Sequence, residues 1–224
     1  MFKRFSICYI LFMFCITGTS AQEDRWTGNA TNLSKGNLRV NSSGRYLEYS
    51  DGTPFLYMGD TAWELISRLN DKETELYLEN RREKGFTVIQ TVILDELDDM
   101  DVSSNGEPKL IDGNIDKPAP GYFTHVDKVI SLAAAKGLYI ALLPTWGDKV
   151  DKQWGKGPEI FTPENAYRYG KWLGERYMNA PNLIWIIGGD RSGDGKNFAI
   201  WNALATGIKS VDKKHLMTYH PHGE

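Results

Sequence analysis

A single aspartate that follows a short apolar run is the strongest candidate for acid–base chemistry in this chain. Residues 181–191 read Pro-Asn-Leu-Ile-Trp-Ile-Ile-Gly-Gly-Asp-Arg, and the run 183–187 has the composition of a strand buried on both faces. Two glycines then free the backbone just before Asp190. A carboxylate just past the carboxyl end of a buried parallel strand is where α/β barrels carry catalytic groups. We therefore expect Asp190 to be catalytic.

Further polar and aromatic side chains are expected at or near the carboxyl ends of the other strands. Because the carboxyl ends of parallel strands meet on one rim of a barrel, residues far apart in sequence are expected to line one pocket there. The candidates for substrate binding are Asp60, Trp63, Gln90, Glu96, Trp146, Arg191 and His220. A structural interpretation stays open for several of them, since Asp60 is also suited to capping a turn and Trp63 to filling the core.

Three of these candidates carry more specific expectations. Trp146 lies between Pro144 and Gly147 in a predicted loop, which favours it as a platform for a sugar ring. A cation beside an acid favours the ionised form of that acid. We therefore expect Arg191 to turn outward or to bind a substrate carboxylate, such as that of a uronic acid. Glu96 is expected to point into the cleft.

No metal ion or other cofactor is expected. The His-Pro-His sequence that begins at His220 lacks a third ligand. The acidic stretch 95–101, aligned to a calcium loop from Asp99, lacks the required glycine at the sixth position and has Leu110 where a glutamate should stand. We interpret this stretch as a solvated acidic loop, and His125 on a predicted helix as a surface or packing residue.

The elements that position these residues alternate between strands and helices. A hairpin of residues 38–40 and 46–49 is expected first. Parallel strands are then predicted at 55–58, 86–93, 138–143, 183–187 and 216–219, and helices at 72–84, around 126–137, 163–177 and 200–211. Asp71 is expected to cap the first of these helices, and Thr162 followed by Pro163 the third.

Five strands that alternate with four helices predict an α/β fold with right-handed βαβ units. A (β/α)₈ barrel needs about 250 residues, so the pattern predicts an incomplete barrel, preceded by the short hairpin. The alternative is an open, doubly wound sheet of five strands. It is disfavoured because no glycine-rich phosphate loop follows the first strand, where the bulky Trp63 stands instead.

The amino-terminal residues predict export from the cytoplasm. Residues 1–21 combine a basic start, an apolar middle and a small-residue exit, as a secretory signal peptide does. Both cysteines, Cys8 and Cys15, lie inside this segment, so the mature chain is expected to contain no disulfide. Its removal takes the formal charge from −3 to −5, which argues against a nucleic-acid partner. We expect a flexible lead over 22–37, a partial catalytic domain over 38–224, no membrane span after cleavage and a periplasmic or extracellular location.

Taken together, the motifs resemble the apiosidase-like glycoside hydrolases, a family of bacterial secreted proteins once known as a domain of unknown function. The matching pieces are Gly-Asp-Thr-Ala-Trp-Glu-Leu at 59–65, Tyr-Leu-Glu-Asn-Arg at 77–81, Lys-Gly-Phe at 84–86, Leu-Pro-Thr-Trp-Gly at 143–147, Tyr-Gly at 169–170, Arg-Tyr at 176–177, residues 185–191 and Thr-Tyr-His-Pro at 218–221. The resemblance runs from about residue 38 to the last residue.

The resemblance implies a (β/α)₈ barrel that cleaves glycosidic bonds in plant polysaccharide, with release of apiose from pectin side chains as the founding activity. It implies that the carboxylate after the fourth strand, here Asp190, is the general acid/base. The partner carboxylate is expected after a seventh strand, beyond Glu224. Glycosidases need both groups, held about 5–5.5 Å apart for retention and roughly 6.5–9.5 Å for inversion. The resemblance favours retention.

Two other classes of function stay open at this point. One is a non-catalytic carbohydrate-binding protein, or an inactive fragment, that uses the aromatic rim alone. The other is a complete five-stranded fold that binds a different small ligand. The partner expected under the leading hypothesis is an oligosaccharide or polysaccharide substrate, and the sequence leaves the sugar, the linkage and the oligomeric state open.

Overall fold

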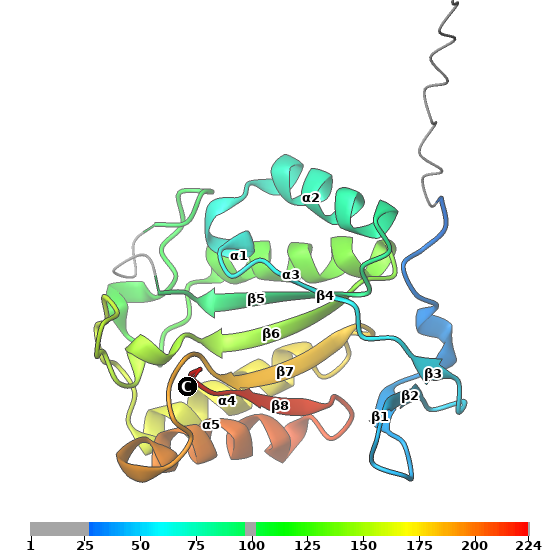
Figure 1. Ribbon diagram of the computed structural model, residues 1–224. Helices are drawn as coiled ribbons and strands as arrows, with labels where there is room; N and C mark the ends of the chain where they lie inside the picture. The colour runs from blue at the N-terminus through cyan, green and yellow to red at the C-terminus, as the bar shows by residue number, and fades with distance from the viewer. Residues whose placement is uncertain (1–26, 97–101, 224) are drawn as a thin grey trace, which may run out of the picture.

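Two β-sheets organise the computed structural model, which describes residues 27–96 and 102–223 (Figure 1). The smaller sheet is antiparallel, in the order β1 (Leu38–Val40), β2 (Leu47–Tyr49) and β3 (Pro54–Phe55). This confirms the hairpin predicted ahead of the barrel. The predicted signal peptide and the start of the predicted flexible lead, up to residue 26, lie outside the described residues.

The larger sheet contains five parallel strands in chain order. They are β4 (Gly59–Thr61), β5 (Val88–Leu94), β6 (Tyr139–Thr145), β7 (Leu183–Gly188) and β8 (Met217–His220). Four of the five match the predicted strands to within a few residues. In Figure 1 the arrows all point the same way, and the small sheet lies by the amino ends of the parallel strands. The carboxyl ends are therefore at the far side from the hairpin.

The predicted first strand at 55–58 is wrong. Phe55 pairs with Leu47 in the small sheet, and the parallel strand begins only at Gly59. The apolar residues between them are the reason for the error, because Leu56 and Met58 are 68% and 46% exposed in a connection rather than buried in a strand. As a consequence Asp60 lies inside β4 and not after it.

The helices are α1 (Leu65–Arg68), α2 (Asp71–Glu83), α3 (Pro120–Ala135), α4 (Pro163–Tyr177) and α5 (Phe198–Val211). The four longer ones were predicted, and the single turn α1 was not. Thr162 caps α4 with Pro163 at its first position, as predicted. Asn70 and not Asp71 caps α2, because it forms a reciprocal capping box with Glu73.

All four longer helices pack against one face of the parallel sheet. Residues of α2 to α5 form one buried cluster with alternate strand residues such as Ile89, Ile140 and Trp185. The intervening residues, such as Val92, Ala141 and Ile186, form a second cluster that contains no residue of α2 to α5 and includes side chains of the small sheet. A doubly wound sheet would carry helices on both faces. The one-sided cover therefore excludes it and identifies the second face as the inner face of a curled half-barrel (Figure 1).

One carboxylate–imidazole pair supports this architecture from the amino end of β8. Asp212 accepts hydrogen bonds from the Trp185 indole at 2.7 Å and lies 2.6 Å from His215 Nδ1. Burial alone would raise the pKa of Asp212, but the hydrogen bonds from His215 and Trp185 hold it well below its ordinary value. The pair joins the end of α5 to β7, at the opposite end of the strands from the rim that carries Asp190.

Candidate active site at the carboxyl ends of the strands

Three aromatic side chains from distant parts of the chain meet at the rim. Trp63 follows β4, Trp146 follows β6 and His220 ends β8. The ring centroids of Trp63 and Trp146 lie 5.1 Å apart, and His220 lies 5.4 Å from Trp63 and 5.6 Å from Trp146. The predicted convergence of strand ends on one rim is therefore confirmed for these three residues.

The two glycines after β7 are required by the closeness of the neighbouring strand ends. Gly188 and Gly189 have φ of 107° and 122°, which side chains rarely tolerate. A Cβ on Gly188 would lie 2.4 Å from the His220 carbonyl oxygen, and one on Gly189 would lie 2.7 Å from the Gly147 nitrogen. The Gly189 amide donates to His220 at 3.0 Å, and its carbonyl accepts from Gly147 at 3.0 Å. The turn thus ties the ends of β6, β7 and β8 together.

This turn places Asp190 at the rim, where its carboxylate is exposed to solvent. Its φ of 55° is in the left-handed region, where a non-glycine residue carries strain and where active-site residues are often found. Its side chain is 42% exposed, and Oδ1 lies 3.3 Å from Nδ1 of His220 without the alignment of a hydrogen bond. The arrangement places one solvent-accessible carboxylate beside an imidazole and the two rim indoles.

Arg191 is buried, so the expectation that it turns outward is wrong. Its guanidinium donates to the carbonyl oxygens of Asp151 at 2.6 Å, Asp190 at 2.9 Å and Lys152 at 2.9 Å. Three polar carbonyls satisfy the charge, which is why burial of the cation is tolerated. Arg191 therefore fixes the loop after β6 against the turn that carries Asp190, and its hydrogen bonds do not point to a substrate carboxylate.

The exposed indole of the rim is that of Trp154, which the sequence analysis missed. Trp154 is 66% exposed and its ring lies 4.5 Å from the guanidinium carbon of Arg191. Because that guanidinium donates to the carbonyl oxygens of Asp151 and Lys152, just before Trp154 in the chain, the ring lies against a cation that is held in place. A tryptophan inside the sequence Lys-Gln-Trp-Gly-Lys, with no apolar neighbour, was the signal for an exposed ring.

Trp146 is only 4% exposed, which contradicts its predicted role as the open platform. It packs in the inner-face cluster, and its indole N–H is buried without a hydrogen-bond partner among the described residues. The Gly189 backbone contributes to this burial, because a Cβ there would lie only 3.1 Å from Cδ2 of the indole. Trp63 is half-buried and forms the more accessible part of this indole pair.

Glu96 lies just past the end of β5 at a small cavity of about 120 Å³. The cavity is lined by Trp63, Glu64, Val92, Asp95, Glu96 and Trp146. Burial raises the pKa of Glu96, and the negative charges of Asp148 and Asp190 raise it further, against an opposing effect of Arg191. Glu96 therefore faces the cleft as predicted, close enough to Asp190 to sense its charge.

Asp60 and Gln90 occupy opposite faces of the sheet. Asp60 pairs in register with Ile89, which faces the helices, and it accepts a hydrogen bond from Tyr77 of α2 at 2.7 Å and an ion pair from Arg81. Partial burial alone would raise the pKa of Asp60, but these two partners lower it. The structure thus places Asp60 against α2 and away from the rim. Gln90 lies on the inner face, one inward position before Val92.

Two buried ion pairs stiffen the loops of the rim. Asp95 is 1% exposed and pairs with Lys109 at 2.8 Å, so the solvated loop predicted from residue 95 is wrong at its first residue, and residues 97–101 lie outside the described part. Asp148 pairs with Lys149 at 3.0 Å and accepts from the Gly157 amide at 2.8 Å, which closes the loop that carries Trp154.

The histidine that was predicted as a surface or packing residue lies on α3. His125 is buried and lies 3.2 Å from Asp71, as a packing residue. Within residues 27–96 and 102–223, no group of three or more His, Cys, Asp or Glu side chains is arranged to hold a metal ion. In the same part of the chain, none of the helices combines the length and apolarity needed to cross a membrane.

Comparison with known proteins places this geometry in a family. The family described as "Apiosidase-like, catalytic domain" matches residues 41–224. A solved structure described as a glycoside hydrolase is 42% identical, with a TM-score of 0.76 over 85% of this chain and 42% of that chain. A glycoside hydrolase family 5 structure from Bacteroides vulgatus is 36% identical, with a TM-score of 0.76 over 86% of this chain and 41% of that one.

More distant structures show the fold alone. The catalytic domain of the Thermobifida fusca endoglucanase Cel5A is 14% identical, with a TM-score of 0.53 over 86% of this chain and 57% of that chain. No match was found among curated proteins. The chain therefore has the fold of part of a (β/α)₈ barrel, and it spans about two fifths of the length of the two more similar structures.

Proposed function

The chain belongs to the apiosidase-like glycoside hydrolases, and we propose that Asp190 is the general acid/base with which it takes part in cleaving a glycosidic bond. The observation that carries the proposal is the turn after β7. Its two glycines hold an exposed carboxylate at the carboxyl end of the fourth parallel strand, beside His220 and the rim indoles. This is the position at which barrel enzymes place catalytic groups.

The reaction requires a carboxylic acid that protonates the departing oxygen and a second carboxylate on the other side of the scissile bond. Asp190 is suited to the first role because its side chain is open to solvent on a fixed turn. The resemblance assigns the second carboxylate to the carboxyl end of a seventh parallel strand, and the parallel sheet of the described residues contains five, β4 to β8. Glu96 has a raised pKa and a position in the cleft, and it is suited to donating a hydrogen bond to a sugar hydroxyl.

We propose a plant cell-wall polysaccharide as substrate, with pectin side chains as the first to be tested, and an exported location in a bacterial host. Trp154 supports a carbohydrate substrate, because an exposed and rigidly held indole offers a flat apolar surface to the C–H face of a sugar ring. Trp63 adds a second aromatic surface, because it lines the same small cavity as Glu96.

The test is hydrolysis of pectic polysaccharide by the full-length protein that carries this sequence, with and without the Asp190 carboxylate, followed as release of reducing sugar. Loss of a general acid/base is expected to lower the rate by about 10²–10⁴. Asp194→Asn is the matched control, since Asp194 is an exposed aspartate of the same loop that contacts Ser192. Hydrolysis that survives Asp190→Asn as well as it survives Asp194→Asn would rule out the assignment.

A second candidate function is carbohydrate binding without hydrolysis. The observation that favours it is the 66% exposure of Trp154, which by itself makes a binding surface. The same assay separates the two functions. Wild-type protein that binds the polysaccharide and releases no reducing sugar has the binding function alone.

A further inference from the structure

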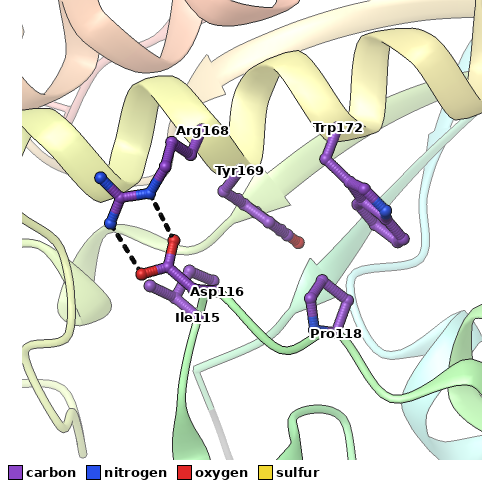
Figure 2. Close-up of a pocket in the computed structure, with 6 residues that line it drawn as sticks. All are labelled: Ile115, Asp116, Pro118, Arg168, Tyr169 and Trp172. Atoms are coloured by element: carbon purple, nitrogen blue, oxygen red, sulfur yellow. Dashed lines mark hydrogen bonds and ion pairs between the residues drawn. The ribbon is translucent and has the colours of Figure 1, made fainter.

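A second cavity lies on the outer flank of the half-barrel, where the connection from β5 to α3 meets the side of α4. Its volume is about 490 Å³, within the range of small-molecule sites. It is lined by Ile115, Asp116, Pro118, Arg168, Tyr169 and Trp172 (Figure 2). We call this group of residues the flank site. The neighbouring helices of α4 are α3 and α5, and neither contributes a side chain to the lining of this cavity.

The helix supplies one wall of the flank site, which is aromatic and rigid. The rings of Tyr169 and Trp172 are nearly parallel, at 13°, with centroids 6.3 Å apart. Phe123 of α3 braces Trp172 edge to face at 4.7 Å. The Tyr169 hydroxyl donates to the Pro144 carbonyl at 3.2 Å, which links this wall to β6 just before Trp146 of the rim. Both rings are therefore held in place without a ligand.

The loop supplies the opposite wall and the polar end. Figure 2 shows Pro118 facing Trp172 across the cavity, and the Asp116 carboxylate meeting the Arg168 guanidinium through two parallel bonds. These bonds are 2.9 Å to Nε and 2.7 Å to Nη2. The loop is preformed, because Leu110 bridges to Pro118 and the Asp116 amide donates to Asn114 at 2.9 Å.

We propose that the flank site binds a sugar unit of the polysaccharide substrate outside the active site. A pyranose ring has an apolar C–H face, which matches the half-buried ring of Trp172, with the buried ring of Tyr169 holding it from behind. Each sugar hydroxyl can both donate and accept a hydrogen bond. The ion pair offers both partners side by side, because Asp116 keeps free carboxylate lone pairs and Arg168 keeps unused N–H groups. The identity of the polysaccharide rests on the proposed function, whereas the sugar chemistry of the flank site rests on these residues.

The charge of the flank site favours hydroxyls over an ionic ligand. Asp116 and Arg168 neutralise each other, so the cavity has no unpaired charge to attract an anion or a cation. Hydrogen bonds from Arg168 hold the pKa of the Asp116 carboxyl below its ordinary value, so the pair persists across the neutral range. An apolar slot with a few oriented polar groups at one end is the usual form of a small-molecule site.

The experiment titrates pectin-derived oligosaccharides into the isotope-labelled chain that carries Asp190→Asn, and follows the indole N–H signals of the tryptophans. Trp172→Phe identifies the flank signal and Trp154→Phe the rim signal. We expect the Trp172 signal to move on titration. Asp116→Asn is expected to weaken that response about three- to tenfold, as loss of one specific contact does. Glu175→Gln is the control, because Glu175 is the acidic partner of an exposed ion pair with Lys171 on the same helix.

The outcomes separate this inference from the proposed function. A Trp172 signal that does not move while that of Trp154 does would overturn the flank site and leave the active site intact. Equal weakening by Asp116→Asn and Glu175→Gln would also overturn it. If the full-length wild-type protein binds through Trp172 but releases no sugar, the flank site stands and the hydrolytic function fails. Asp116 is an exposed side chain, so its replacement tests the site without loss of the fold.

Discussion

Replacement of Gly189 by alanine tests whether the turn after β7 is built by close approach of the strand ends. The new Cβ would lie 2.7 Å from the Gly147 nitrogen and 3.0 Å from Trp146 Cα, and these backbone atoms, just past the end of β6, have little room to yield. The φ of 122° adds a conformational cost of about 1–3 kcal/mol for a non-glycine residue. The reduced freedom of the unfolded chain offsets only about 0.4–1 kcal/mol. With the steric overlap included, we expect a loss of about 3 kcal/mol or more in the free energy of unfolding.

Gly195→Ala is the matched control, since Gly195 is in the same loop with φ of 58° and a Cβ there meets nothing within 4 Å. It should cost about 1 kcal/mol or less, because only the left-handed backbone is penalised. Urea denaturation measures both, and with a slope of about 3 kcal/mol per molar the midpoint of Gly189→Ala should fall by about 1 M. Equal midpoints for the two variants would refute the close-approach argument.

Three further predictions follow from individual contacts. Trp154→Ala should raise KM for a polysaccharide several-fold without a change in the unfolding midpoint, because the ring is exposed and its support Arg191 stays bonded to three carbonyls; a fall in stability instead would show a packing role. Glu96→Gln should become more stable relative to wild type as the pH rises. The raised pKa of Glu96 means that its protonated carboxyl stabilises the wild-type fold fully below pH 4.5, and this contribution is lost as the pH rises through the folded-state pKa. Thermal melts of both proteins from pH 4 to 8 measure the difference. Asp212→Ala should cost about 3–5 kcal/mol at neutral pH, and since the pKa of Asp212 is lowered, that difference should shrink as the pH falls below its unfolded value of 3.8.

The sequence was sufficient to predict the layered order and the position of Asp190. Strands such as β7 and helices such as α4 carry local signals, namely a short apolar run ended by glycines and a Thr-Pro start. The double glycine before Asp190 reports a local need for positive φ, so the candidate acid could be identified without knowledge of its neighbours.

The predictions that failed depend on contacts between distant segments. The first parallel strand, Gly59–Thr61, has no apolar run and is defined only by its pairing with β5. Arg191 is buried because carbonyl oxygens of a loop about forty residues away in sequence accept its hydrogen bonds, and Asp95 is buried because it pairs with Lys109. Trp146 and Trp154 are both loop tryptophans, and only the tertiary packing shows that Trp146 lies in the inner-face cluster while Trp154 is 66% exposed.

The most direct test of the central claim compares leaving groups in the Asp190→Ala variant. An acid that protonates the departing oxygen matters greatly for a sugar alcohol and little for a nitrophenolate, which departs without a proton. We predict that kcat/KM falls by about 10²–10⁴ for the natural linkage and by far less for a nitrophenyl glycoside of the same sugar. An equal fall for both substrates would contradict the assignment of Asp190 as the acid.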